Sequence, residues 1–359
     1  MPTMAERIRR PELPVLGREL RSTMRGRRLI ARLAVAGLLP VALGFLILLL
    51  IQAPDTENTT ELLRSLPFIG RAVFLALVAA EFLLLTVLAP ALTAGAFTAE
   101  GEAQTLEPLL LTPLSSANLV AGKLLCAAGT LALLLLCGFP IAGVAALYGG
   151  IVPADLAWTQ GILAATLLFA AALGLYISTL ARRTIWAMLV AYAATVLLLL
   201  WPLGFFVFIE LLGNFPSETT VQIVLYAAAL LPAAGLATPI MHGCAPWVRG
   251  RLAQNLRRRR WALFTLWGSV FLGAYASAVY GLTRALADFR DNVVYLFLGN
   301  PFAALALHGA VMYYPIYEEP SAPPLIEYFI PATLVLLLLG TLLLCWATVQ
   351  RVNLLRRPE

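Results

Sequence analysis

The stretch KLLCAAGTLALLLLCGFPIAGVAALY (residues 123–148) has a single charged residue, the lysine at its first position. A helix needs about 20 mainly apolar residues to cross the roughly 30 Å of hydrocarbon in a bilayer, so this stretch is long enough to span a membrane. Six further runs meet the length condition cleanly: 29–51, 72–98, 157–181, 184–211, 261–283 and 325–349. An eighth span is predicted at 221–244, where Pro232 and Pro239 break the helix. Membrane helices tolerate such breaks when neighbours satisfy the freed carbonyls.

The composition agrees with a chain embedded in lipid. Of its 359 residues, 61% are hydrophobic and 12% are charged, whereas soluble domains are about 45–50% apolar and about 25% charged. These charges are too few to cover a globule of this size, and a surface that faces lipid does not need them. We therefore predict an all-α polytopic membrane protein with about eight transmembrane helices, in one membrane domain at residues 29–359.

The basic residues predict the orientation of the chain, because cytoplasmic loops of membrane proteins carry an excess of lysine and arginine. With the N-terminus inside and eight spans, all but four of the 25 lysines and arginines lie on the cytoplasmic side. This sorting predicts that both termini are cytoplasmic. It also accounts for the net charge of +6, so we expect no nucleic-acid partner.

One more apolar segment, VVYLFLGNPFAALALHGAVMYY (293–314), tests the number of spans. As a full span it would place the arginine-rich C-terminus outside, and Asn300-Pro301 interrupts it near its middle. We predict that residues 293–322 form a re-entrant or interfacial helical hairpin on the outer side, which contains Asn300, Pro301 and Phe302.

Two basic segments are expected at the cytoplasmic membrane surface. In residues 12–33 apolar residues recur every four positions among arginines, which predicts an amphipathic interface helix within residues 1–28. An ordinary basic flank that orients the first span is the alternative. The run RGRLAQNLRRRRWALF (249–264) is interpreted as a topology signal, and a site for anionic lipid is its alternative.

The loop AFTAEGEAQTLEPLLLTPLSSANLVAGKLL (96–125) is the only predicted cytoplasmic loop with an acidic cluster, formed by Glu100, Glu102 and Glu107. Thr105 is expected to cap a short helix that begins with Leu-Glu-Pro, since proline is tolerated in a first helical turn. Glu107 then lies near the positive end of that helix.

The second half of this loop is expected to end the short helix and begin the next span. Pro113 stops the helix, and Ser115 or Ser116 caps the span that follows. Three consecutive leucines, at positions 109–111, require a partner or the membrane surface to cover them. The prediction is a short, stiff helix across the cytoplasmic mouth of the bundle, with a tight structural loop as the alternative.

Motifs for catalysis and metal binding are absent from the sequence. There is no G-x-x-x-x-G-K-[ST] pattern, because Gly122-Lys123 is followed by Leu124 and lacks the first glycine. The two histidines, His242 and His308, form no H-E-x-x-H motif, and the four cysteines have no metal-ligand spacing. We expect no enzymatic activity, no catalytic residue, no metal and no cofactor bound by this chain.

Three stretches in order along the chain resemble type-2 ABC transporter permeases: GRELRSTMRGRR, EGEAQTLEPLLLTPLSSANLVAGKLL, and GNPFAALALHG before the last span. The acidic loop is the most specific of them. The resemblance implies the permease subunit of an ATP-driven exporter in a bacterial cytoplasmic membrane, surrounded by membrane lipid. It also implies a separate ABC ATPase subunit that holds ATP and Mg²⁺, and a second permease copy in a homodimer or related heterodimer.

The resemblance assigns roles to particular segments. Residues 12–28 correspond to the interface helix, 293–322 to the outer hairpin, and the loop at 99–122 to the coupling helix that docks on the ATPase. The chain departs from the family in having eight predicted spans instead of six, and in Pro108, where an apolar residue is common. The resemblance places the following residues on the docking loop: Glu100, Glu102, Thr105, Leu106, Glu107, Leu110, Thr112, Pro113 and Leu114.

Glu81 is the one acidic residue deep in a predicted span, and such residues are functional candidates. We expect it either to line a translocation path or to tie two helices together by a hydrogen bond. Two other functions are compatible with the sequence. One is a secondary transporter without an ATPase, which would usually show an internal repeat, and the other is a non-transporting membrane anchor or assembly protein.

Overall fold

The secondary structure is helical throughout the described part of the chain. The computed structural model describes the following residues: 42, 59–112, 114–196, 300–313 and 325–356. These ranges contain helices joined by turns and no β-strand, as the predicted all-α class requires. Several predicted segments lie outside them: 1–28, 29–51 apart from residue 42, 221–244, 249–264 and 261–283.

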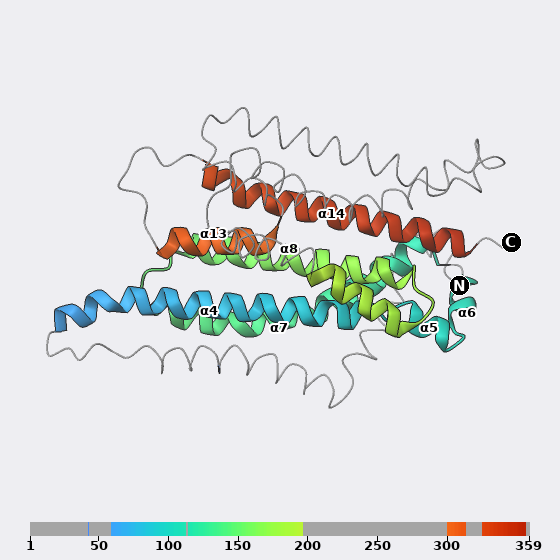
Figure 1. Cartoon of the computed structure of the whole chain (residues 1–359), viewed down its shortest axis with the longest axis horizontal. Coiled ribbons are helices and arrows are strands. Elements are labelled where there is room, and N and C mark those ends of the chain that lie inside the picture. The colour runs from blue at the N-terminus through green and yellow to red at the C-terminus, as the bar shows by residue number, and fades with distance from the viewer. Residues whose placement is uncertain (1–41, 43–58, 113, 197–299, 314–324, 357–359) are drawn as a thin grey trace, which may run out of the picture.

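Within the described ranges, four helices are long and apolar enough to cross a membrane, and they pack side by side (Figure 1). They overlap four of the predicted spans. A shorter apolar helix, Thr184–Val196, begins where the span predicted at 184–211 begins, and residues from 197 onward lie outside the described residues. The long helices are α4 (Thr59–Thr93), α7 (Ser116–Leu147), α8 (Pro153–Ser178) and α14 (Leu325–Leu355).

The helices extend beyond the apolar runs that marked them in the sequence. α7 begins at Ser116, ahead of the predicted start at residue 123, because Ser115 caps it. The Ser115 hydroxyl accepts the N–H of Asn118 at 3.1 Å, which is the standard N-cap arrangement. One of the two predicted caps is therefore confirmed. Hydropathy marks the part of a helix that lies in lipid and leaves out polar turns at its ends.

α8 is the central helix of the described bundle and packs against α4, α7 and α14. Its second half is almost entirely buried and is rich in small residues, which let helix backbones approach closely in a membrane. The small buried residues are Ala165, Ala170, Ala171, Ala172 and Gly174. Gly174 is essential to this approach, because a Cβ at that position would overlap the Thr93 hydroxyl of α4.

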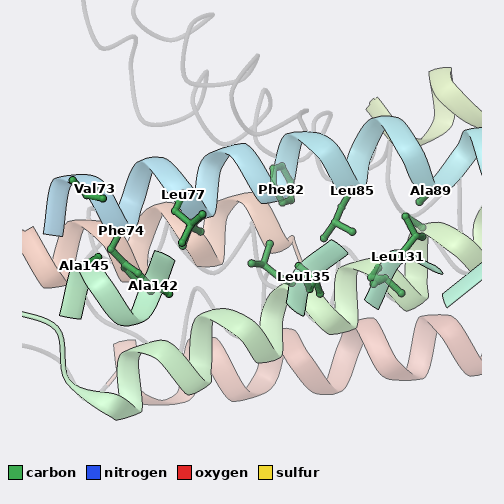
Figure 2. Packing of buried hydrophobic residues seen from close by; sticks show 14 of the residues in the cluster. Val73, Phe74, Leu77, Phe82, Leu85, Ala89, Leu131, Leu135, Ala142 and Ala145 are labelled. Carbon is green, nitrogen blue, oxygen red and sulfur yellow. The ribbon is translucent and has the colours of Figure 1, made fainter. Parts of the chain in front are cut away.

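One apolar cluster joins α4 and α7 along much of their length (Figure 2). Phe74, Leu77 and Leu85 of α4 are fully buried in it. Leu131 and Leu135 of α7 lie in the same cluster, and Figure 2 shows them between the two helices. The α4–α7 pair thereby forms one side of the bundle, with α8 packed against both helices.

The turn between α7 and α8 is held against α4. Gly149 and Gly150 have φ values of +88° and +82°, a conformation that glycine adopts without strain. The Arg71 Nε of α4 donates to the Gly150 carbonyl at 2.9 Å. A Cβ at Gly70 would lie 2.7 Å from the Gly149 carbonyl oxygen, so this glycine permits the close contact.

α13 (Pro301–Tyr313) is the described part of the predicted outer hairpin. Its 13 residues rise about 20 Å, which is too short to cross roughly 30 Å of hydrocarbon. The Asn300 side-chain oxygen accepts the N–H of Ala303 at 3.1 Å and caps the helix. The His308 Nε2 lies 3.8 Å from Asp155 Oδ1, next to the start of α8. The rest of the hairpin lies outside the described residues.

Candidate functional site

Two short helices lie between α4 and α7 in the chain. They fall in the predicted docking loop at 99–122, except that the first begins one residue earlier. They are α5 (Thr98–Glu102) and α6 (Leu106–Leu110). Figure 1 places both at the end of the bundle where α14 also ends. We call residues 98–112 the α5–α6 segment. Its bonds to the surrounding helices are described in turn below.

Glu100 joins α5 to α7 through an ion pair. Its Oε1 lies 2.7 Å from the Lys123 Nζ, and only 4% of the Lys123 side chain is exposed. The ammonium also lies 5.3 Å from the centre of the Phe97 ring, where the π electrons attract a cation. Lys123, the first residue of the apolar run at 123–148, therefore links α7 to α5 inside the bundle.

Glu102 joins α5 to the helix Thr184–Val196. Its carboxylate accepts the Thr184 N–H at 2.8 Å and the Thr184 hydroxyl at 3.0 Å. The N-terminus of a helix carries partial positive charge and unpaired N–H groups, so a carboxylate stabilises it. Glu102 thus acts as the cap of a helix that begins 82 residues later in the chain.

Ser178 joins the start of α5 to the end of α8. Its hydroxyl accepts the backbone N–H of Phe97 at 2.8 Å and that of Thr98 at 3.3 Å. The α4 helix ends at Thr93, so these two N–H groups lie at the beginning of a new helix, where partners within the helix are lacking. Without the serine hydroxyl they would be buried and unpaired.

Thr105 precedes α6 as predicted, but its hydroxyl does not cap that helix. Its backbone is near-helical, with φ −97° and ψ −7°, whereas a capping residue is normally extended. The hydroxyl instead donates to the Glu100 carbonyl at 3.2 Å. The predicted side-chain cap is therefore wrong, and Thr105 closes the turn between α5 and α6.

α6 has one face on the bundle and one face exposed. Leu106, Leu109 and Leu110 pack against a buried apolar cluster that comprises Phe97, Leu119, Val120, Leu175 and Val352. Glu107 and Pro108 are exposed, and Leu111 is 85% exposed. The bundle therefore covers two of the three consecutive leucines, and the third projects beside an acidic residue.

The residues after α6 are bonded to the last helix. The Arg356 Nη1 at the end of α14 donates to the Leu114 carbonyl. Within the segment, the Thr112 hydroxyl donates to the Leu109 carbonyl at 2.6 Å. α6 ends at Leu110, and Pro113, which was predicted to end it, lies outside the described residues.

The α5–α6 segment is thus continuous with α4 and bonded to α7, α8 and the helix Thr184–Val196. Leu114, two residues after the segment, is bonded to α14. All of these bonds lie at the same end of the bundle. A force on the exposed face of α6 would therefore reach the ends of all these helices together. This arrangement suits transmission of movement into the membrane, and it contains no nucleophile–base pair or phosphate-binding loop within the described residues.

Glu81 lies inside α4, away from the α5–α6 segment, and is fully buried. Its Oε2 accepts a hydrogen bond from the Gln160 Nε2 of α8 at 3.3 Å. A Cβ at Gly138 of α7 would overlap Oε1, so the missing side chain there provides the space for the carboxyl group. The hydrogen bond links α4 to α8, as one of the two predicted roles requires. Lining of a translocation path stays a prediction.

The remaining predicted site residues belong to α13, which Figure 1 shows apart from α5 and α6. Asn300 precedes α13, and Pro301 and Phe302 are its first two residues. Among the residues with described positions, no group of three or more His, Cys, Asp or Glu side chains could hold a metal ion.

Several residues that build the site were not singled out from the sequence as bonding partners. They are Ser178, Thr184, Gln160 and Arg356, together with Lys123 as an ion-pair partner. A polar residue at the end of an apolar run indicates only weakly that its side chain bonds to another helix. Their partners lie far along the chain, so no local spacing identifies the pairs.

The chain was compared with models of known protein families. A model described as "ABC-2 family transporter protein" matches residues 13–242, which is more than half of the chain and includes the whole α5–α6 segment. The chain belongs to this ABC-2 family. The resemblance inferred from the acidic loop is therefore confirmed, and the chain is a multi-pass membrane component of an ABC transporter. A comparison with curated proteins found no match.

Proposed function

We propose that this chain is the permease subunit of an ATP-driven ABC exporter, with the α5–α6 segment as its docking element for a separate ATPase. Family membership supports a transport role. The observation that carries the rest is the bonding of this one short segment to α7, α8 and the helix Thr184–Val196, together with the bond of Leu114, just after the segment, to α14. ATP and Mg²⁺ bind to the partner ATPase in this proposal.

The exposed face of α6 has the composition of a docking surface. Leu111 projects with 85% of its surface exposed, next to Glu107 and Pro108. An apolar side chain that inserts into a pocket of a partner is a typical anchor of a protein interface. A carboxylate at its rim favours a partner with a basic residue beside that pocket. The ATPase surface that receives α6 therefore combines an apolar pocket with a positive charge.

Movement passes from the ATPase into the membrane through the bonds of the segment. ATP binding closes a pair of ATPase subunits and displaces α6. Packed helices respond to such a displacement by moving between discrete arrangements, because tightly packed interfaces do not deform continuously. The bonds of Glu100 and Glu102 transfer the displacement to α7 and to the helix Thr184–Val196. The transport path then opens on alternate sides of the membrane.

Two permease copies, identical or related, complete the transporter in a bacterial cytoplasmic membrane. The described helices leave many large apolar side chains on the outside of the bundle, which suits contact with lipid and with a second permease. These exposed side chains include Leu136, Phe139, Leu147, Leu338, Leu342 and Trp346. Because the bundle is incomplete without such surroundings, purification should retain both lipid and partner subunits.

Copurification tests the proposal. The tagged chain, extracted from its native membrane in a mild detergent, is expected to bring with it a nucleotide-hydrolysing subunit in a one-to-one ratio. Recovery of the permease alone, together with transport driven by an ion gradient in its absence, would favour a secondary transporter instead.

Point variants test the docking face. Glu107→Arg and Leu111→Asp are each expected to weaken binding of the ATPase about tenfold or more, as loss of an interface anchor does. Asn353→Arg is the matched control, since Asn353 is exposed on α14 at the same end of the bundle. Unaltered assembly and ATP turnover in both docking variants would contradict the assignment of this face.

A further inference from the structure

Among the residues that the structure describes, Glu81 is the only acidic residue that is buried. It lies about 16 Å along α4 from Gly70, which packs against the α7–α8 turn. This distance is about half of the roughly 30 Å of hydrocarbon in a bilayer. Glu81 therefore lies near the middle of the membrane, where ionisable side chains are rare and functional.

The carboxyl group has few hydrogen bonds. Gln160 Nε2 donates to Oε2 at 3.3 Å, whereas Oε1 is buried and has no partner among the described residues. The hydroxyl groups of the same helix are satisfied in a different way, since those of Thr86 and Thr93 each donate to the carbonyl four residues earlier at 2.8 Å. An ionised carboxylate has about four sites that accept hydrogen bonds. Most of that capacity is unused at Glu81.

No cation neutralises Glu81 within the described part of the bundle. Arg71 of the same helix is bonded to the α7–α8 turn. On the elements packed against α4, the titratable side chains with described positions on this half of the bundle are those of Cys137, Tyr148, Asp155 and His308, and the last two face each other. None of these forms an ion pair or a hydrogen bond with Glu81. A carboxylate that is isolated and buried in this way is strongly disfavoured relative to the same group in water.

The space around the carboxyl group also restricts what it can bind. The notch at Gly138 is filled by Oε1 itself, so no ligand fits between α4 and α7 at this point. A hard metal ion needs six or more oxygen ligands for Ca²⁺, or near-ideal octahedral coordination for Mg²⁺. Only one carboxyl group and one amide meet here. A proton requires no additional ligand and no additional space.

We propose that Glu81 is an intramembrane proton-binding site, protonated while α4, α7 and α8 are packed together and deprotonated when they separate. In the packed arrangement the carboxylic acid keeps its proton, and its carbonyl oxygen accepts the Gln160 hydrogen bond. When the helices separate, water reaches the carboxyl group, takes up the proton and hydrates the carboxylate. Repacking requires the uptake of one proton from water, which restores the starting state.

This inference rests on the proposed function, because the ATPase supplies the force that separates the helices. The three helices around Glu81 are all joined at their ends to the α5–α6 segment. α4 leads into it, Lys123 joins it to α7, and Ser178 joins it to α8. Displacement of the segment by an ATPase therefore acts on the packing that surrounds the proton site.

Infrared spectroscopy of the full-length chain in lipid tests the resting state. The difference between wild type and Glu81→Gln at neutral pH is expected to show the carbonyl band of a protonated carboxylic acid. Bands of an ionised carboxylate in its place would overturn the proposal. Gln160→Leu assigns the same carbonyl band to Glu81 even if Glu81→Gln does not fold, because loss of the hydrogen bond from Gln160 should shift that band. The exposed Glu107, replaced in Glu107→Gln, is the control and should give carboxylate bands only.

A second measurement uses the complex with the ATPase held closed by a non-hydrolysable ATP analogue. The Glu81 carbonyl band is expected to decrease while carboxylate bands increase. An unchanged band with the closed ATPase bound would overturn proton release. Failure of any ATPase to bind would overturn the proposed function instead, and the resting band would still report on protonation of Glu81.

Discussion

Replacing Lys123 with methionine removes the cation that joins α7 to α5 while it preserves most of the apolar volume of the side chain. In the wild type the ammonium lies 2.7 Å from Glu100 Oε1, with 4% of the lysine side chain and 28% of the glutamate side chain exposed. The other carboxylate oxygen, Oε2, is buried and has no partner among the described residues. The variant therefore leaves a carboxylate with little to neutralise it.

The expected cost follows from this partial burial. Removing one partner of a fully buried ion pair costs about 3–5 kcal/mol, because the remaining charge is buried alone. Water can reach part of Glu100, which lowers the cost, and loss of the contact with the Phe97 ring adds about 0.5–1 kcal/mol. We expect a total of about 2 kcal/mol, which corresponds to an opening equilibrium of the α5–α6 segment about 30-fold more favourable.

Amide hydrogen exchange of the full-length chain in lipid measures this equilibrium. Peptides that cover residues 98–112 should lose about 30-fold of their protection in Lys123→Met, and Lys123→Met combined with Glu100→Leu should recover part of it, since no unpaired charge remains. Arg182→Met is the control, because Arg182 is exposed. Equal protection in wild type and Lys123→Met would refute the role of this ion pair.

Three further predictions concern contacts of the same bundle. Ser178→Ala leaves two buried N–H groups unpaired, so exchange at the start of α5 should increase by the equivalent of about 1–3 kcal/mol, and unchanged exchange would contradict this. Glu102→Gln weakens the cap on Thr184 and should lower the protection against amide exchange of the helix that begins there, whereas equal protection in the variant would contradict the cap. Gly174→Val overpacks α8 against α4 and should destabilise the chain by about 1–3 kcal/mol in denaturing detergent, whereas Gly143→Ala, where a Cβ would meet nothing within 4 Å, should be tolerated.

The positions of the helices could be predicted from the sequence because the bilayer imposes its thickness on each span. The runs at 72–98, 123–148, 157–181 and 325–349 all coincide with long helices, although their polar ends were missed. The short helix after Thr105 and the cap at Ser115 also follow from local chemistry, since a cap bonds to a residue three positions away. The Thr105 side-chain cap failed because the conformation of the turn, and not the residue type, decides where a hydroxyl points.

Composition and local patterns were enough to predict that the chain is a membrane protein, where its main helices lie, and which loop resembles a docking element of the ABC-2 family. Each of these properties depends on residues that are close together in the chain. The pairing of Lys123 with Glu100, the cap that Glu102 provides to a helix 82 residues away, and the position of Glu81 between Gly138 and Gln160 became visible only in the folded bundle. The members of each pair lie far apart in the chain, so only the packing of the helices determines which pairs form. At Glu81 hydrocarbon provides no partner, and the polar contact must come from another helix.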